Sequence, residues 1–365
     1  MPFALPRAET RCRIALLLLL CGSVAVPVRA GGTTGAAVAT TVGRRPQSDL
    51  TIRVLLARVA SMPPGDGTAR SVWSGRPYRG GIDVVPDAGG FAVINRVDLD
   101  EYLRGVLPGE IGSRDPRDRA ALQAQAVAAR TYAAARMGER RPLYDVVATV
   151  ADQVYGGMSV ERPETDAAVR DTRGLVLTWA DRIITAPYHA HGGTVTAALD
   201  EVFWRRGAEP YLRPVDDRLP DGRCYCDAGG TRTWERRFTL QELTQRLAQH
   251  GKEIGTSSRA EVRGVRVSAR GASGRVTVLE LETSAGAVTV RGNDIRLLLR
   301  TGGDILPSTS FSLEAGQGQV VLRGAGNGHG VGMSQWGAIG RARAGQDARA
   351  ILAAYYPGTR LAPLL

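Results

Sequence analysis

The sequence predicts a mixed α+β fold, in which a core with one alanine-rich helix is joined by a mostly β module near residues 239–313. Two observations support this prediction. The segment PRDRAALQAQAVAARTYAAAR, which begins at Pro116, is rich in good helix formers. Short β-type runs, broken by glycine, occupy residues 80–97 and 262–290.

Further elements are expected along the chain on similar grounds. Residues 51–59 are expected to form a strand, and residues 80–97 a hairpin. A short helix starts near Val97 and leads to Glu110. Beyond the alanine-rich helix, the pattern indicates extended structure at 145–155, a hairpin at 174–188 and a helix at 239–249.

The alanine-rich helix is the element around which we expect the site to form. Pro116 suits its first turn, where a missing N–H costs nothing. Leu122, Ala126, Arg130 and Ala133 then fall on one face at helical spacing. A face made mostly of alanine lets another element approach closely, so Arg130 should reach into a site or an ion pair.

Glu110 is a candidate acid/base. It is expected just ahead of the helix, in a turn whose direction Pro108 and Gly109 fix. A carboxylate on a rigid turn, with Arg130 within reach, is a reasonable acid/base arrangement. The alternative is that Glu110 is a surface or capping acid.

The excess of basic residues narrows the classes of molecule that the protein is expected to bind. Basic residues outnumber acidic ones, 47 to 36, and all but Lys252 are arginines. This bias is more typical of a GC-rich genome than of a specific arginine site. A basic protein favours polyanions such as nucleic acid, anionic lipid or an acidic wall polymer. The arginines are scattered and no nucleic-acid motif is present, so we expect no nucleic-acid partner.

Residues 1–30 have the pattern of a signal peptide. Three arginines precede an apolar run that begins at Ile14, and Val28-Arg29-Ala30 gives a cleavage pattern of small residues. The run is short for a membrane span, so membrane contact is expected only through this segment. Cys21 faintly resembles a lipoprotein site. Residues 31–50 are expected to be a flexible lead-in, and the mature protein is expected in the periplasm, cell wall or medium.

Two cysteines remain after export, Cys224 and Cys226. A disulfide between residues two apart is geometrically awkward, and free thiols are a liability in an oxidising compartment. With His189 and His191 they would suit a closed, structural tetrahedral zinc site. The alternatives are an intermolecular disulfide or two unpaired thiols.

The segment GAGNGHGVGMSQWGAIG, residues 324–340, is dense in glycine, which lets backbone approach a ligand closely. Trp336 would stack on a sugar face, while His329 and Gln335 would hydrogen-bond hydroxyls. Ser334 projects from the same segment. No Gly-Lys-Ser/Thr follows, so this is not a phosphate-binding P-loop. The alternative is a tight glycine turn with one buried tryptophan.

Seven segments together resemble the SpoIID/LytB family, named for stage II sporulation protein D and the amidase enhancer. They are VDLDEYLRGVLPGEI, ALQAQAVAARTYAAA, DQVYGG, PYHAHGGTVT, PYLRPV, GHGVGMSQWGA and ILAAYYPGT. They occur in the family's order and span residues 51–365, which the resemblance makes one SpoIID-like catalytic domain.

The resemblance implies a peptidoglycan lytic transglycosylase acting on MurNAc-GlcNAc glycan strands. Glu110 takes the place of the family's catalytic acid/base, and Arg130 that of an arginine in the same cleft. Tyr356 and the GHGVGMSQ residues fall in matching blocks and are expected to bind substrate. Some family members hold zinc by His and Cys near an HxxxGG block, for which this chain has HAHGG.

In this chemistry one carboxylate suffices, because the substrate's own C6 hydroxyl replaces water and closes a 1,6-anhydro ring. No cofactor is required for it. As an acid, Glu110 must be partly protonated near neutral pH, yet a helix N-terminus and Arg130 would both favour its charged form. The second hypothesis is a non-catalytic wall binder that enhances an N-acetylmuramoyl-L-alanine amidase.

Overall fold

The computed structural model describes residues 50–63, 70–112, 114–139, 141–230 and 232–364. The expected signal peptide, 1–30, and all of the expected lead-in except residue 50 lie outside these residues. Helices and strands are both present, with the strands in several small sheets, so the predicted mixed α+β class is confirmed. No helix in the described ranges combines the length and apolarity needed to span a membrane.

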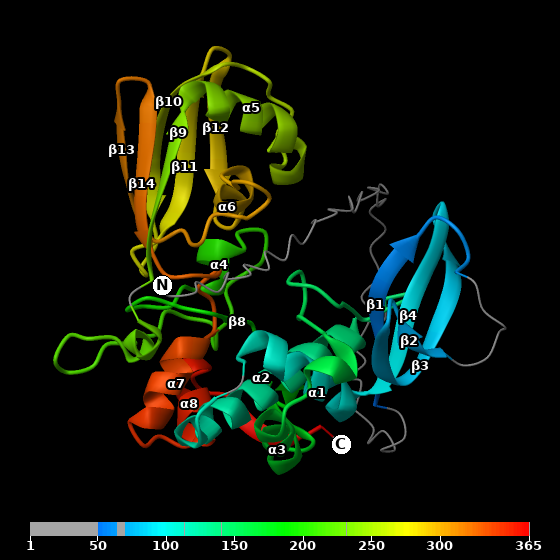
Figure 1. Ribbon diagram of the computed structural model, residues 1–365. Helices are drawn as coiled ribbons and strands as arrows, with labels where there is room; N and C mark the ends of the chain where they lie inside the picture. Colours follow the sequence, from blue (N-terminus) through cyan, green and yellow to red (C-terminus); the bar gives the residue numbers. More distant parts are fainter. Residues whose placement is uncertain (1–49, 64–69, 113, 140, 231, 365) are drawn as a thin grey trace, which may run out of the picture.

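A five-stranded sheet forms one end of the molecule, drawn in blue and cyan in Figure 1. Its order is β2-β3-β4-β1-β5, and β1 pairs antiparallel with β4 and parallel with β5. The strands are β1 (Thr51–Val59), β2 (Arg70–Trp73), β3 (Arg76–Asp87), β4 (Gly90–Asp98) and β5 (Val146–Val147).

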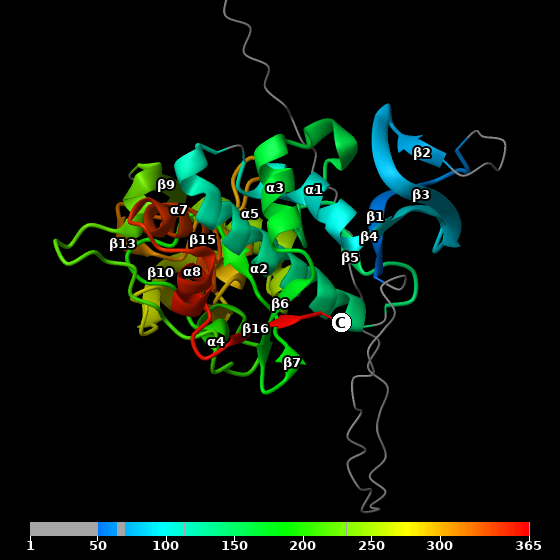
Figure 2. The same ribbon diagram turned by 90° about the horizontal axis from the view of Figure 1, so that it is seen from below.

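Helices pack beside this sheet around α2, the predicted alanine-rich helix. It contacts each of the four helices packed around it, because its small side chains, buried along most of its length, permit close approach. Figure 2 shows it between α1, α3 and α8. The helices are α1 (Leu99–Glu110), α2 (Arg119–Gly138), α3 (Pro163–Asp171), α7 (Gln335–Arg343) and α8 (Ala348–Tyr355). Pro116 lies in a 3-10 turn, η2 (Pro116–Asp118), immediately before α2.

Short elements connect the two halves of this core. A three-stranded sheet joins β6 (Leu175–Trp179), β7 (Arg182–Ile183) and β16 (Arg360–Pro363). A parallel pair joins β8 (Tyr188–His189) and β15 (Met333–Ser334). Helix α4 (Leu199–Val202), with the 3-10 turns η3 (Gly157–Val160) and η4 (Tyr225–Gly229), completes it. Segments distant in sequence therefore share one hydrophobic core.

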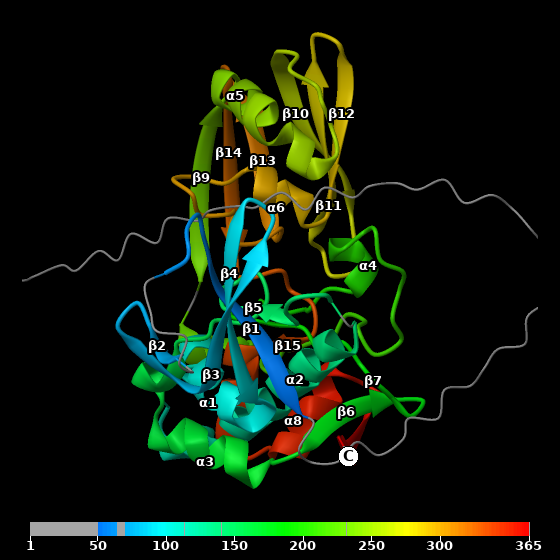
Figure 3. The same ribbon diagram turned by 90° about the vertical axis from the view of Figure 1, so that its right-hand side faces the viewer.

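A second module stands on this core (Figures 1 and 3) and has a hydrophobic core of its own. Its two sheets have the orders β10-β11-β12 and β13-β14-β9. This core extends beyond residues 239–313 on both sides because β9 and β14 pair in antiparallel register. The elements are β9 (Thr233–Thr239), α5 (Leu240–His250), η5 (Gly251–Ile254), β10 (Val262–Arg270), β11 (Val276–Thr283), β12 (Gly286–Arg291), α6 (Asp294–Leu298), β13 (Phe311–Gly316) and β14 (Gln319–Ala325).

Candidate functional site

Glu110 is the last residue of helix α1, and Pro108 lies inside that helix. The expectation of a turn ahead of the next helix was therefore wrong at this point. The helix begins well, because Asp98 accepts hydrogen bonds from the backbone N–H groups of Asp100 and Glu101. Its last turn carries no basic residue. A carboxylate at the C-terminal end of a helix faces the negative end of the helix dipole, which disfavours the charged form.

Two glycines bring a distant loop to Glu110. A Cβ at Gly105 would lie 2.5 Å from the ring of Tyr155, and one at Gly109 would lie 2.9 Å from the side chain of Val154. These glycines are one turn apart on α1, so they form a smooth face on which the loop packs. As a result, the backbone N–H of Val154 donates to Oε1 of Glu110 at 2.7 Å.

Burial has the largest effect on the pKa of Glu110. It raises the pKa of the carboxyl to about 7, although the hydrogen bond from Val154 and the side chain of Gln335 both lower it. The amide Nε2 of Gln335 is buried and makes no hydrogen bond of standard geometry, while still lying near the carboxyl. A carboxyl with a pKa near 7 is well matched to giving and taking a proton at neutral pH.

Two tyrosines lie close enough to feel the charge of Glu110: Tyr102 is fully buried and Tyr188 is partly buried. Gln153 bridges them: its Oε1 accepts from Tyr102 at 3.2 Å, and its Nε2 donates to the Tyr188 hydroxyl at 2.9 Å. Burial raises the pKa of both tyrosines, and the charge of Glu110 contributes in the same direction. Both stay neutral at ordinary pH. Sequence reasoning recognised the DQVYGG and PYHAHGG segments but assigned no role to Gln153, Val154 or Tyr188.

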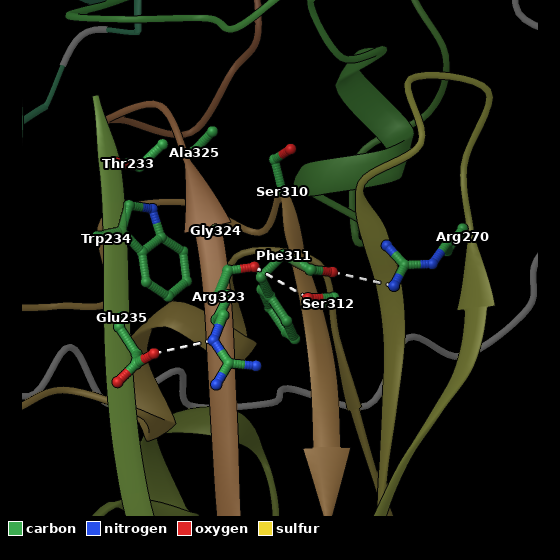
Figure 4. A pocket seen from close by; sticks show the side chains of 10 residues that line it. All are labelled: Thr233, Trp234, Glu235, Arg270, Ser310, Phe311, Ser312, Arg323, Gly324 and Ala325. Carbon is green, nitrogen blue, oxygen red and sulfur yellow. Dashed lines mark hydrogen bonds and ion pairs between the residues drawn. The ribbon is translucent and has the colours of Figure 1, made fainter. Parts of the chain in front are cut away.

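Two surface pockets of the described residues lie away from Glu110. One, of about 770 Å³, is on the second module, beside Trp234, Phe311 and Arg323 (Figure 4). The other, of about 520 Å³, lies where the end of α2 meets β6 and β7. Chemistry, rather than pocket size, singles out Glu110.

Arg130 does not lie beside Glu110, which corrects the sequence expectation. It is fully buried, and its Nε donates to Asp100 at 2.7 Å, near the opposite end of α1. Ten residues of helix separate Asp100 from Glu110, about 15 Å. The other nitrogens donate to the carbonyl oxygens of Val169 and Leu175. Of the two roles considered for Arg130, a site or an ion pair, the structure has the ion pair.

Ser334 positions the start of α7 next to Glu110. Its Oγ accepts from the N–H of Gly337 at 3.2 Å, as an N-cap, and from the N–H of Gly192 at 3.1 Å. Gln335 is thereby fixed as the first residue of α7. Ser334 itself is fully buried, so its hydroxyl serves the helix cap rather than a sugar.

Trp336 is partly exposed, as a stacking platform for a sugar requires. The guanidinium of Arg114 lies over its ring at 4.7 Å from the centroid. Its backbone N–H donates to the carbonyl of Ala190 at 3.1 Å, a second contact between α7 and the HAHGG segment. Gln335 and Trp336 are the residues of this segment that remain candidates for substrate contact.

Comparisons with known proteins agree with this geometry. A family model described as stage II sporulation protein matches residues 87–179, which include Glu110 and Val154. An uncharacterised protein of Brachyspira hyodysenteriae is 30% identical over 287 residues, which is 78% of this chain and 72% of that protein. Stage II sporulation protein D of Bacillus subtilis is 29% identical over 297 residues, covering 73% of this chain and 75% of that protein. The chain belongs to the SpoIID/LytB family.

Other matches extend the comparison. The amidase enhancer of Bacillus subtilis is 28% identical over 297 residues, which is 71% of this chain but only 40% of that longer protein. The second module has a match of its own, because a family model described as a domain of unknown function covers residues 229–332. SpoIID/LytB membership thus rests on matches that span most of the chain, including the region around Glu110, while the model that matches the second module describes it only as a domain of unknown function.

Two residues carried over from the family resemblance lie in the wall of the core. The Nε2 of His329 faces the carbonyl of Tyr188 at 2.9 Å, and its Nδ1 accepts from the N–H of Val331. Burial lowers the pKa of His329 to about 3, so the ring is neutral. The hydroxyl of Tyr356 donates to the carbonyl of Pro187 at 2.8 Å, and the side chain is fully buried. Tyr356 is therefore held inside the core rather than at a surface that a substrate could reach, whereas substrate contact by His329, which is only partly buried, stays a prediction.

The predicted zinc ligands do not converge. Cys224 and Cys226 are joined to each other by a disulfide, contrary to the expectation that this pairing is awkward. Among the described residues, no three His, Cys, Asp or Glu side chains are grouped to hold a metal. His189 and His191 are buried, and the Nε2 atom of each has no hydrogen-bond partner. The two cysteine sulfurs that would complete the zinc site are bonded to each other in the disulfide. The residues therefore do not fit a closed four-ligand site, and zinc occupancy stays a prediction.

Proposed function

We propose that this SpoIID/LytB protein is a peptidoglycan lytic transglycosylase that cleaves MurNAc-GlcNAc glycan strands, with Glu110 as general acid and then general base. The observation that carries the proposal is the largely buried carboxyl of Glu110, whose pKa is raised to about 7. Near that pH both protonation states are populated, so one group can serve in both steps. Family membership and the relatives' names support a role in sporulation or the cell wall.

Among the described residues, the loop that packs against Glu110 offers no second free carboxyl, which favours the lytic reaction over hydrolysis. Hydrolytic glycosidases usually use two carboxyl groups, one as acid and one as nucleophile or base. Asp152 lies on the same loop as Val154, but it accepts from Tyr132 at 2.8 Å and pairs with Arg136 at 2.7 Å. It also accepts from the backbone of Val147, so it is not available to activate water.

The steps follow from the arrangement of Glu110. Its carboxylic acid gives a proton to the glycosidic oxygen, and the bond from that oxygen to C1 of MurNAc breaks. The C6 hydroxyl of the same sugar then attacks C1 and loses its proton to the carboxylate, which closes the 1,6-anhydro ring and restores the acid. The attacking group is intramolecular, so orientation supplies much of the rate. The N–H of Val154 holds Oε1, which leaves Oε2 to carry the proton.

The substrate implies the surroundings in which the protein works. Peptidoglycan lies outside the cytoplasm, in agreement with the signal-peptide pattern of residues 1–30. The exported protein would meet glycan strands in the periplasm or wall, with Trp336 as a stacking surface and Gln335 beside the acid. None of these steps uses a metal.

The test is digestion of purified glycan strands, followed by mass analysis for 1,6-anhydro-MurNAc ends. Glu110→Gln should abolish product while leaving folding and strand binding intact. The matched control is Glu101→Gln, which changes an acid on the same helix near its other end. Anhydro ends released at the normal rate by folded Glu110→Gln would remove Glu110 from the mechanism.

A second function is favoured by the similarity to the amidase enhancer. In that case the chain would bind the wall and stimulate an N-acetylmuramoyl-L-alanine amidase without cutting sugars. Wild type and Glu110→Gln would then stimulate a purified amidase equally, and neither would release anhydro ends. Release of anhydro ends by the wild-type protein alone would exclude a purely non-catalytic role.

A further inference from the structure

One arginine of the second module reaches into the first core. Arg275 lies between β10 and β11, yet its side chain is almost fully buried, with 1% exposed. Its guanidinium donates to the carbonyl of Gly192 at 2.5 Å, in the HAHGG segment of the first core. A Cβ at Gly330 would lie 2.6 Å from the guanidinium carbon, so a glycine is needed there for the arginine to enter.

The turn that carries Arg275 is itself fixed to the first core. Glu201, on α4, accepts from the backbone N–H of Ala272 at 2.7 Å and from the hydroxyl of Ser273 at 2.6 Å. Figure 1 shows α4 at the base of the module. The turn is thus held at two points, one on α4 and one at Gly192.

Hydrogen bonds continue from Gly192 to the site. The N–H of Gly192 donates to Oγ of Ser334, and that oxygen also caps α7. The next residue, Gln335, is the one whose side chain lies beside Glu110. Each link is buried, where a displaced hydrogen bond is costly and a shift is passed on to the next group.

We propose that Arg275 is a positioning residue for the reaction: through Gly192 and Ser334, the second module sets the place of Gln335 against Glu110. This inference rests on the proposed function of Glu110 and gives the module a role in it. The energetic argument is that a buried guanidinium without a hydrogen-bonded carboxylate is expensive to keep, even with the charge of Glu201 nearby. Two of its nitrogens, Nε and one terminal nitrogen, have no partner. An apolar side chain would fill the space more cheaply, so the contact with Gly192 calls for a functional reason.

The test compares Arg275→Met with Arg275→Lys in the full mature chain, measuring anhydro-end release against pH. Arg275→Met should lower kcat at least about tenfold, since small displacements of positioning groups are costly. The contact with Gln335 lowers the pKa of Glu110, so its loss should raise that pKa. The pH at which activity falls should therefore be higher in Arg275→Met than in wild type. Arg275→Lys can still donate to the carbonyl of Gly192, so its kcat and its pH profile should lie between those of Arg275→Met and wild type.

The matched control is Arg300→Met. Arg300 is a buried arginine of the same module, but its hydrogen bonds go to Leu297 and Glu253 within that module. Its loss should lower the stability of the module while leaving the pH at which activity falls unchanged. Equal shifts from Arg300→Met and Arg275→Met would overturn the proposal, since general loosening of the module would explain both.

A milder variant decides the matter if Arg275→Met does not fold. Glu201→Gln loosens the turn that carries Arg275 without opening a cavity, and a smaller shift in the same direction is expected. An unchanged pH profile in Glu201→Gln would then refute the inference. The two proposals can be refuted separately. If Glu110→Gln is inactive but Arg275→Met has the activity and pH profile of wild type, only the role of Arg275 is refuted. If Glu110→Gln is fully active, the proposed function is refuted.

Discussion

The backbone N–H of Val154 donates to Oε1 of Glu110 at 2.7 Å and joins the end of α1 to a loop 44 residues further along the chain. This bond stabilises the charged carboxylate, but burial of the same carboxyl has the larger, opposite effect. The position of Glu110 at the C-terminal end of α1 works in the same direction as burial. Arg130, one of the two groups expected to hold Glu110 charged, pairs instead with Asp100 near the other end of α1.

Activity should therefore fall as the pH rises through about 7, because the acid step needs the protonated carboxyl. The measurement is the initial rate of anhydro-end release on glycan strands at low substrate, from pH 5 to about 9 at constant ionic strength. Far-UV circular dichroism over the same range controls for unfolding. A rate that stays flat between about pH 6 and 8 would contradict the assignment of the acid.

Stability should depend on Glu110 in a defined pH window. Its pKa in the folded protein, about 7, lies above the ordinary 4.5, so its contribution to stability is present below pH 4.5 and lost as the pH rises through 7. Glutamine does not ionise. Glu110→Gln should thus match wild type below pH 4.5 and exceed its free energy of unfolding above pH 7, by on the order of 3 kcal/mol. Urea denaturation at several pH values measures this difference; a pH-independent difference would speak against a raised pKa.

Arg130→Met should destabilise the fold by about 3 kcal/mol, since it leaves Asp100 with only the more distant Arg173 and removes the donor to the carbonyl oxygens of Val169 and Leu175. The rate per folded molecule should stay near that of wild type. Arg119→Met, on the same helix with a side chain 70% exposed, serves as control and should change stability by less than about 0.5 kcal/mol. If Arg130→Met is as stable as wild type but has no activity, Arg130 has a role in the reaction after all.

Cys224 and Cys226 should resist alkylation until a reductant is added, because they are bonded to each other. Intact-mass analysis of protein that begins at residue 31, with and without reductant, measures this directly. Metal analysis of the same sample tests zinc independently. About one zinc per chain, together with two thiols that are alkylated without reductant only after a chelator removes the metal, would replace the disulfide with the metal site predicted from the sequence.

Much of the site follows from local sequence. LPGE at the end of one helix and the alanine-rich helix after it identify Glu110 and its supporting element without any knowledge of the fold. Even so, the local pattern put Glu110 in a turn, because Pro108 commonly ends a helix and here does not. The residues that complete the site are Val154, on a loop, and Gln335, at the start of α7, and no local pattern specifies that these two segments meet α1.

By itself, the sequence determined the family and the α+β class and put Glu110 forward as the candidate acid, since these depend on residue order and on short-range periodicity. Tertiary structure alone decided where Arg130 and His329 point, that Tyr356 is buried, and that Cys224 bonds Cys226. The physical reason is that helical spacing tells which side chains share a face, but not which distant segment covers that face. Burial and partners, and with them the pKa of Glu110, exist only once those segments meet.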